Sequence, residues 1–404
     1  MFCLATARIK HVPPPPPPSA PIYLDNQSTT PLDPSVLEVM LPYFTQTYGN
    51  PHASEHIFGW QAFSALENAR FEIADLICAE KSNIVFTSGA TESISLAILG
   101  LALPSNDRSR DKIITVATEH ACVLESCKQM ERLGYEVVVL PVASDGIVDL
   151  DMLEKQLDDK TLLVSVMLAN NEIGVLQPVA EVAKMCRKFG CFSHTDATQA
   201  FGKIPIDVDA LDVDMLSASA HKLYGPKGIG LLFLRDGMES RLSPLTYGGG
   251  QERGLRPSTA AVPLAVGFGA AARLAGENMA DENKRIIALR DLFLNQLRES
   301  APELTILGSM EHRLSGNLSL IFPNISGNSL VEALGDRLAV STGSSCSSVS
   351  SEPSHVIRAL GVGDDVASAA LRISIGRFNT EEEIQQAANL LLSIANKGGA
   401  NASL

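Results

Sequence analysis

The sequence predicts an α/β fold, with a mainly parallel sheet in a large domain and a smaller α+β domain after it. From Ile84 to Arg235, short apolar runs alternate with amphipathic helical stretches at the spacing of repeated β-α-β units. After about residue 265, this alternation gives way to a long helical stretch and scattered short strands. The chain has 404 residues, of which 45% are hydrophobic, and this is enough for two domain cores.

The expected large sheet is of the seven-stranded type, because seven short apolar runs follow one another in this region. They lie in the stretches NIVFTSGATES, KIITVATEHACVLESC, YEVVVLPV, TLLVSVMLANNE, CFSHTDA, VDMLSASAHK and GIGLLFLR. The amphipathic stretches LDMLEKQLDD and VAEVAKMCRKFG supply helices between them. Strands separated by such helices are expected to run parallel, with helices on both faces of the sheet.

We expect three segments, bounded at residues 1–21, 22–264 and 265–404. The first contains six consecutive prolines and is expected to be a disordered, extended spacer. An organelle presequence is a second interpretation of it, because it lacks acidic residues and carries Arg8 and Lys10. The second segment is the large domain, whose first residues are expected to pack on the small domain. The third segment is the small domain.

Composition excludes several classes of partner. The formal net charge is −14 and there is no run of Lys or Arg, so we expect no nucleic-acid partner. No apolar run approaches the ~20 residues of a membrane span, so no membrane contact is expected. The seven cysteines form an odd set without a secretory signal, which indicates reduced thiols and a cytoplasmic protein.

Two pairs of cysteines have metal-site spacing, but we expect no metal. Cys122 and Cys127, and Cys186 and Cys191, are C-x₄-C pairs, and buried structural cysteines are the favoured interpretation. The acidic stretch DVDALDVD is expected to be a solvated face of an exposed connection.

Polar residues follow five of the expected strands at the point where each strand ends. They are Thr87–Glu92, Thr118–His120, Asn170–Glu172, Asp196–Gln199 and Ser217–Lys222. Ligands of open α/β folds bind at the carboxyl ends of the strands, so these residues are expected to form one site.

Asp196 and Lys222 follow successive strands of this set. They could form a structural ion pair, but a cofactor that acts as an electron sink requires the same two groups. Pyridoxal phosphate needs a lysine for a Schiff base and a carboxylate beside its pyridine nitrogen. Ser219, His221 and the helix start at Gly89–Thr91 can donate to a phosphate, and His120 can stack on a ring. The combination predicts a pyridoxal phosphate site.

With these residues in place, the sequence resembles a known family. The similarity lies in YLDNQSTTPLDP, YGNPHASEHIFGW, FTSGATES, TEHACVLESC, NNEIGVLQP, HTDATQAFGKIPIDV, SASAHKLYGPKGIG, GGGQERGLRPST, GSSCSS and LRISIGRFNTEEE. In this order they resemble cysteine desulfurases of the iron–sulfur-assembly and nitrogen-fixation type, which are class V aminotransferases with the fold-type-I architecture of pyridoxal-phosphate-dependent transferases.

The resemblance implies an activity and its partners. L-cysteine is converted to L-alanine, and the sulfur is left as a persulfide that passes to an acceptor or iron–sulfur scaffold protein, chiefly for cluster assembly. A selenocysteine lyase, or another lyase or transaminase of class V, is the alternative within enzymes. A non-catalytic thiol or metal scaffold is the alternative outside them.

The resemblance also implies roles for residues of this chain. Lys222 forms the Schiff base, His120 stacks on the ring and moves protons, and Cys346 accepts the sulfur. The residues implied in cofactor binding are Ala90, Thr91, His120, Asn171, Asp196, Gln199, Ser219, His221, Lys222 and Thr259. Thr259 acts from the other subunit, which implies a homodimer. The residues implied in substrate binding are Asn50, Asn171 and Arg372.

The sequence departs from the family pattern at a few positions. Ile94 and Ser95 replace a polar, Asn-containing pair, and Thr198 stands where Ala is usual. Pro257-Ser258 replace Ser-Gly, and Ser345 replaces Ala before the cysteine. The short ending IANKGGANASL argues against docking to a scaffold through a Trp-containing tail and favours the nitrogen-fixation type. None of these changes removes a functional group named above.

Cys346 lies in the stretch STGSSCSSVSSEPS, which has no apolar periodicity. A sulfur acceptor must enter the site, take the sulfur and carry it outward. A loop rich in Ser and Gly provides that reach, and we therefore expect a mobile cysteine loop.

Overall fold

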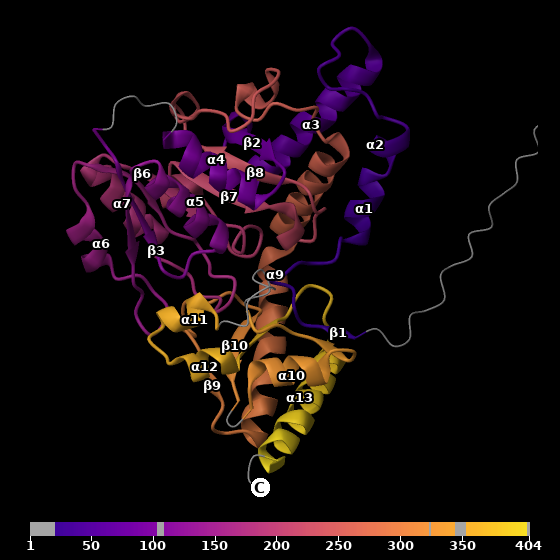
Figure 1. The fold of residues 1–404 in the computed structure, drawn as a ribbon. Coiled ribbons are helices and arrows are strands. Elements are labelled where there is room, and N and C mark those ends of the chain that lie inside the picture. The colour runs from indigo at the N-terminus through magenta and orange to yellow at the C-terminus, as the bar shows by residue number, and fades with distance from the viewer. Residues whose placement is uncertain (1–20, 103–108, 323–324, 344–352, 402–404) are drawn as a thin grey trace, which may run out of the picture.

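The computed structural model describes residues 21–102, 109–322, 325–343 and 353–401, without side chains from residue 396 onward. The six consecutive prolines of the predicted tail and Cys346 therefore lie outside the described residues. Figure 1 shows a broad upper part that contains the large sheet and a narrower lower part formed by the C-terminal elements. No helix in the described ranges is long and apolar enough to cross a membrane.

The large sheet has seven strands in the order β2-β8-β7-β6-β5-β3-β4. The strands are β2 (Ile84–Thr87), β3 (Lys112–Val116), β4 (Glu136–Leu140), β5 (Thr161–Ser165), β6 (Phe192–Asp196), β7 (Met215–Ser219) and β8 (Gly230–Leu234). All neighbouring pairs from β7 to β4 are parallel, whereas β8 runs antiparallel to both β7 and β2. The mainly parallel sheet predicted from the sequence is confirmed.

The two faces of this sheet belong to different cores, because successive side chains of a strand point to opposite sides. Ile84 and Phe86 of β2 pack in one core with helices α3 (Ile57–Asp75) and α9 (Val262–Ser300). Val85, between them, packs in a second core with α4 (Ala90–Ala102) and α5 (Ala121–Arg132). Helices α6 (Leu150–Gln156) and α7 (Val179–Phe189) cover the β3–β5 region in a third core.

Helix α9 extends through both parts of the molecule (Figure 1). Its 39 residues give a length of about 60 Å. The N-terminal part buries Phe268 in the large-sheet core, and the C-terminal part buries Phe293 in the core of the lower part. The predicted domain boundary at residues 264/265 thus falls inside one continuous helix.

The lower part contains two small sheets. Strand β10 (Asn317–Ile321) pairs antiparallel with β12 (Ala370–Ser374) and β9 (Thr305–Ile306). Strand β1 (Ile22–Tyr23) pairs parallel with β11 (Leu338–Ala339), so the start of the described chain lies against the C-terminal elements. The described residues of this part also form the helices α10 (Gly327–Leu334), α11 (His355–Ala359), α12 (Asp364–Ala369) and α13 (Glu381–Asn401).

The remaining helices connect or flank these parts. They are α1 (Pro34–Met40), α2 (Pro42–Thr45), α8 (Val208–Leu211) and the short 3₁₀ turns η1 (Lys81–Asn83), η2 (Ala220–Lys222), η3 (Glu239–Arg241) and η4 (Gln251–Gly254).

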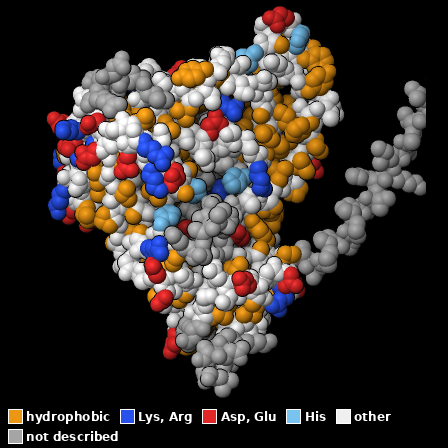
Figure 2. Space-filling view, viewed as in Figure 1, with side chains coloured by type: hydrophobic (Ala, Val, Ile, Leu, Met, Phe, Trp, Pro, Cys, Tyr) orange, Lys and Arg blue, Asp and Glu red, His pale blue; other side chains and the backbone are white. Residues whose placement is uncertain are grey.

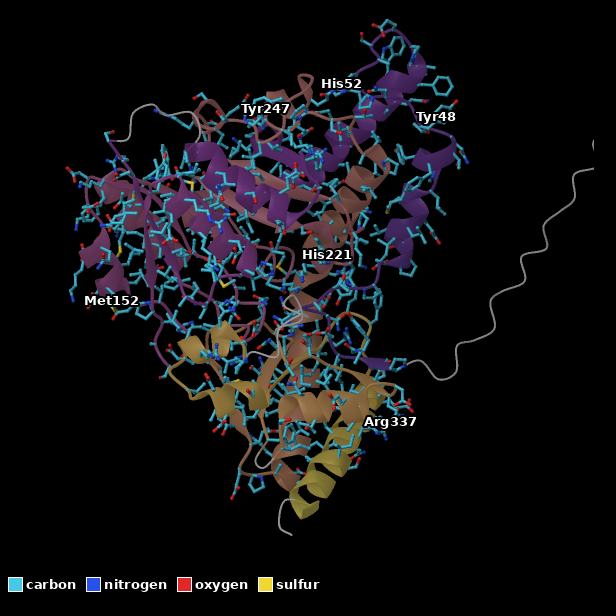
Figure 3. All side chains as sticks on the ribbon, in the orientation of Figure 1. Tyr48, His52, Met152, His221, Tyr247 and Arg337 are labelled. Carbon is cyan, nitrogen blue, oxygen red and sulfur yellow. The ribbon has the colours of Figure 1, made fainter. Side chains whose placement is uncertain are left out.

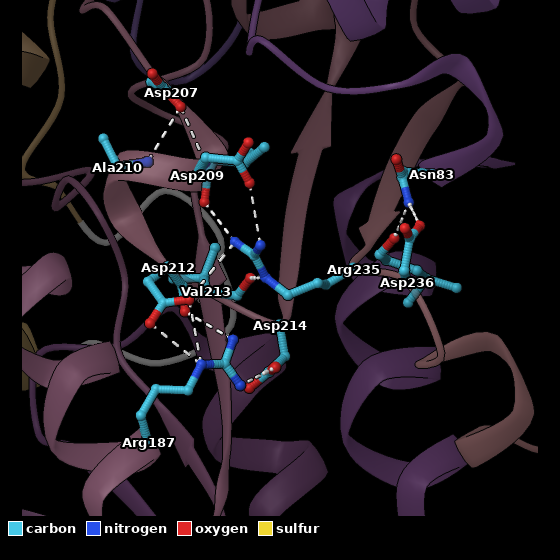
Figure 4. Close-up of polar contacts among 12 residues, drawn as sticks. Asn83, Arg187, Asp207, Asp209, Ala210, Asp212, Val213, Asp214, Arg235 and Asp236 are labelled. Carbon is cyan, nitrogen blue, oxygen red and sulfur yellow. Dashed lines mark hydrogen bonds and ion pairs between the residues drawn. The ribbon is translucent and has the colours of Figure 1, made fainter.

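The acidic stretch at α8 is only partly the solvated face that the sequence predicted (Figure 4). Asp209 is exposed and pairs with Arg235 at 3.1 Å. Asp214, in contrast, is buried. It accepts hydrogen bonds from the Ser193 N–H at 2.7 Å and from Arg187 at 2.6 Å. Asp214 directly precedes β7, and its hydrogen bonds connect this strand to Arg187 of α7 and to Ser193 of β6. A buried carboxylate needs such hydrogen-bond donors.

Candidate active site

A cavity of about 490 Å³ lies between the large sheet and the lower part. This volume is in the range of small-molecule sites. Figure 3 shows His221, one of its lining residues, near the junction of the two parts, far from Tyr48 and Tyr247 at the upper end. The cavity is lined by these sequence-predicted residues: Ala90, Thr91, His120, Asn171, Asp196, Gln199, Ser219, His221, Lys222 and Arg372.

The strand ends bring most of these groups together, as the sequence predicted. Helix α4 begins immediately after β2, and its N-terminal turn lines the cavity. Gly89 precedes it with a φ of +157°, and a Cβ placed there would point toward the Ser219 hydroxyl 4.0 Å away. The missing side chain leaves a cradle between a helix N-terminus and a hydroxyl, an arrangement that suits a phosphate.

Lys222 ends the short turn η2 that follows β7. Its Nζ donates to the carbonyl oxygens of Gln27 and Ser28, both at 2.6 Å. Asp196 ends the neighbouring strand β6 and is buried, and its Oδ1 accepts the Thr198 N–H at 2.9 Å. The amine and the carboxylate therefore line the same cavity and are each held by their own backbone contacts.

Arg372 enters the cavity from strand β12 of the lower part. Its Nη2 forms an ion pair with Asp25 at 2.7 Å, and its Nη1 donates to the Asn171 carbonyl at 2.9 Å. The guanidinium is therefore fixed in a fork-shaped orientation that suits a carboxylate.

Several buried polar atoms of the cavity residues have no hydrogen-bond partner within the described protein. They are Gln27 Nε2, Asn171 Oδ1, Thr198 Oγ1 and Arg372 Nε. Buried polar groups are nearly always satisfied, so this set indicates a polar ligand. A phosphorylated pyridine and an amino acid carboxylate match the donors and acceptors that remain.

Two bases in or beside the cavity have lowered pKa values. Burial, with the nearby charge of Lys222, lowers the pKa of His221 to about 4, so its ring is neutral near pH 7. Burial and the same charge lower the pKa of Lys203 to about 7. Lys203 donates to Gln199 Oε1 at 3.4 Å and thereby orients that side chain.

Three predicted residues are not brought to the cavity of this chain by its described part. Asn50 is exposed between α2 and α3, where its side chain accepts the His52 N–H at 3.0 Å. Thr259 is also exposed, outside the lining residues. Cys346 lies outside the described residues. Gly343, the last described residue before it, lines the cavity.

The structure adds lining residues that sequence reasoning missed. Gln27, Ser28 and Thr29 come from the segment before α1, and Lys227 follows η2. The first three lie in YLDNQSTTPLDP, which the resemblance included without assigning it a role.

The interpretation of the four paired cysteines as buried structural residues is correct for Cys127, Cys186 and Cys191 and wrong for Cys122. Cys122 lines the cavity, with its Sγ 2.9 Å from His120 Nδ1. Its position two residues after His120, at the start of a helix, was the signal in the sequence. Within the described ranges, no group of three or more His, Cys, Asp or Glu could hold a metal ion.

Comparisons with known proteins identify the family to which this chain is similar. The family described as aminotransferase class V matches residues 22–387. A curated relative from Rickettsia rickettsii, named cysteine desulfurase IscS, is 49% identical over 377 residues, which cover 93% of this chain and 92% of the relative. A solved structure named NifS-like protein superposes with a TM-score of 0.86 at 39% identity, covering 93% of this chain and 99% of that one. Another, named SspA in complex with cysteine, has a TM-score of 0.76 at 35% identity and covers 89% and 99% of the two chains.

Proposed function

The chain belongs to the class V aminotransferase family, and we propose how its residues carry out the reaction of a cysteine desulfurase. It is a pyridoxal-phosphate-dependent enzyme that converts L-cysteine to L-alanine. One observation carries the assignment of residues: Lys222, Asp196 and His120 from the large sheet meet Arg372 from the lower part in a single cavity.

When bound, pyridoxal phosphate supplies an electron sink for charge that develops at the substrate α-carbon. Asp196 would hold its ring nitrogen, and His120 would lie against the ring. The α4 N-terminus at Ala90 and Thr91, with Ser219 and His221, would hold the phosphate. Gln199 and Asn171 would contact the phenolic side of the ring. The cradle at Gly89 and the unpartnered oxygens of Asn171 and Thr198 support this placement.

Arg372 is proposed to bind the carboxylate of L-cysteine. Its Nε is buried without a partner, whereas Asp25 and the Asn171 carbonyl hold its other two nitrogens. A fixed guanidinium loses little conformational entropy when it binds a carboxylate. Asn50 stays a predicted substrate residue and would have to reach the cavity from a partner subunit.

Lys222 is proposed to move the proton at the substrate α-carbon. Its Nζ lies in the cavity, and the carbonyls of Gln27 and Ser28 fix its position. A positioned lysine can serve as a general base and acid in this way.

Cys346 is proposed as the sulfur acceptor. Its thiolate attacks the sulfur of bound cysteine and a new S–S bond forms. The substrate C–S bond breaks with its electron pair left on the β-carbon, which takes up a proton to give the methyl group of alanine. The resulting persulfide passes to a sulfur acceptor, which we propose to be an iron–sulfur scaffold protein. This chemistry requires a reduced thiol and therefore a reducing compartment such as the cytoplasm.

We propose that the enzyme is a homodimer. Large hydrophobic side chains of α1, α2 and α3 are exposed, including Phe44 at 54%, Trp60 at 55% and Phe63 at 55%. Figure 2 shows hydrophobic side chains gathered on the upper right of the molecule, where Figure 1 has α1, α2 and α3. Such contiguous apolar faces mark protein interfaces. The exposed position of Thr259 agrees with a phosphate contact across that interface, and sedimentation of the holoenzyme tests the association.

The decisive experiment measures products from L-cysteine with a thiol reductant present. We expect alanine and sulfide in equal amounts, without a keto-acid requirement. A need for a keto acid would indicate a transaminase, and turnover with selenocysteine alone would indicate a selenocysteine lyase. Either outcome would overturn the proposed assignment.

A further inference from the structure

His120 lies between strand β3 and helix α5, and its ring closes the first turn of that helix. Nδ1 accepts the backbone N–H of Cys122 at 3.2 Å, so His120 is the N-cap residue. The Sγ of Cys122 lies 2.9 Å from the same Nδ1. Both side chains line the cavity.

These two contacts determine which ring nitrogen carries the proton. A backbone N–H can only donate, so Nδ1 must present its lone pair to it. In a neutral imidazole, the proton then lies on Nε2. A thiol that retains its hydrogen adds a second donor to Nδ1.

The Cys122 thiol does retain its hydrogen near neutral pH. Burial raises the pKa of the Cys122 thiol, and the opposing effect of the hydrogen bond to His120 is smaller. The thiol is therefore a donor at the ring nitrogen, and it is a poor nucleophile in this state.

We infer that Cys122 is a positioning residue, whose S–H and N–H together hold His120 as the neutral tautomer protonated at Nε2. This inference rests on the proposed place of His120 beside the cofactor. In a doubly protonated ring, the hydrogen on Nδ1 would face the hydrogen of the Cys122 N–H. The two donors repel each other, so the backbone N–H disfavours the charged form of the ring. Nε2 is consequently the atom through which His120 donates a proton to, or accepts one from, the reacting groups.

Two carboxyls, those of Glu119 and Glu172, interact electrostatically with His120. Asp196, Lys222, Lys227, His221 and Arg372 line the same cavity, and His355 contacts the Glu119 carbonyl. A substitution of Cys122 leaves all of them in place. The difference between variant and wild type therefore isolates the contribution of the thiol.

The primary test is ¹⁵N NMR of the histidine rings in the holoenzyme, with His120 assigned through a His120→Gln variant. The wild type is expected to show a protonated Nε2 and an unprotonated Nδ1 across the pH range of activity. Cys122→Ala removes one donor, so the midpoint for ring protonation should move to higher pH. The loss of one hydrogen bond should lower kcat roughly two- to tenfold with KM within twofold.

Two further variants make the test specific. Cys122→Ser keeps a donor at this position and should restore the wild-type tautomer and most of kcat. Cys127→Ala alters a buried thiol on the same helix and should change neither the NMR pattern nor the pH profile. A proton on Nδ1 in the wild type, or an unchanged His120 titration in Cys122→Ala, would overturn the inference. The NMR result is read without turnover, so it is independent of whether the proposed desulfurase assignment holds.

Discussion

The two sides of the cavity are built in different ways. On the large-sheet side, Asp196, Lys222 and His120 each lie at, or within a few residues of, the end of a buried strand. On the other side, Arg372 is held by Asp25, 347 positions away, and by Asn171, 201 positions away. Local strand and turn geometry sets the strand ends of the first side, and the distant Gln27 and Ser28 carbonyls then hold the Lys222 amine. The second side exists only when distant segments have assembled.

The described residues on either side of positions 344–352, which include Cys346, also depend on contacts with a distant part of the chain. Ser354 donates to Glu172 Oε2 at 2.6 Å, and a Cβ on Gly343 would meet the same oxygen at 2.5 Å. Burial raises the pKa of Glu172. One buried carboxyl from the large-sheet side therefore contacts residues on both sides of positions 344–352. This contrast implies that cofactor chemistry and sulfur transfer can be separated by mutation.

The largest effect is expected on the large-sheet side, for Lys222→Ala. Loss of the amine would remove both the proposed covalent attachment of the cofactor and the proposed proton transfer. Turnover should fall by about 10⁴-fold or more, and the yellow colour of the free enzyme should be lost. Alanine release and the visible spectrum are the measurements. Lys227→Ala, a cavity lysine given no role in the reaction, is the control, and normal desulfuration by Lys222→Ala would refute the assignment.

The next effect separates the cofactor chemistry from the sulfur transfer, because Cys346→Ser removes only the proposed sulfur acceptor. A hydroxyl is much less acidic and less nucleophilic toward sulfur than a thiol. The variant should fold, remain yellow and change its spectrum with L-cysteine, yet release alanine about 10²-fold more slowly or worse. In the wild type, mass spectrometry should find added sulfur on the Cys346 peptide. Added sulfur on Cys122 or Cys127 instead would contradict the loop mechanism.

A smaller effect is expected for Asp25→Asn, which changes the residue that pairs with Arg372 on the second side of the cavity. The ion pair to Arg372 is lost, so the guanidinium is less well oriented for the substrate. A hydrogen bond to a charged group contributes about 1.5–3 kcal/mol, so KM for L-cysteine should rise roughly 10- to 100-fold. Asp33→Asn, which breaks the 3.0 Å pair with Arg377 outside the cavity, is the matched control. Equal KM changes in both variants would count against a specific role.

The smallest effect concerns the pH dependence of stability on the large-sheet side. His194 lies between the Ser165 and Ser217 hydroxyls, and burial lowers its pKa to about 3. The pKa of a histidine in the unfolded chain is about 6.5. Between pH 3 and pH 6.5, the unfolded chain therefore binds one more proton at this residue than the folded protein does. Stability is therefore lost as the pH falls through that window, by about 1.4 kcal/mol per pH unit from this group.

His194→Gln should remove that contribution. Thermal unfolding of both proteins from pH 7 to pH 4 gives the slope of stability against pH for each. Burial raises the pKa of Glu119, which has the opposite effect on stability, but this effect is the same in both proteins and cancels in the difference between the slopes. The exposed His312→Gln is the control. If stability falls with pH equally in the wild type and in His194→Gln, the buried ring does not cause the loss of stability in acid.

Much of the large-sheet side could be predicted from the sequence. Apolar runs of strand length followed by polar residues determine both the strands and their polar ends. For this reason the order of residues along the chain was enough to assign Asp196, Lys222, His120 and the Gly89 turn to one site. The motif match added Arg372 and Asn171 by resemblance, and the structure places both in the cavity.

Only the tertiary structure shows which distant groups contact these site residues. Periodicity contains no information on the antiparallel insertion of β8 between β2 and β7, because a buried strand has the same apolar pattern in either direction. It also could not show that α9 joins both cores, or that Asp25 and Gln27 contact the site. Cys122 combines both kinds of information: its position two residues after the helix-capping His120 is visible in the sequence, and so is their local contact, but only the tertiary structure decides that both side chains line the cavity.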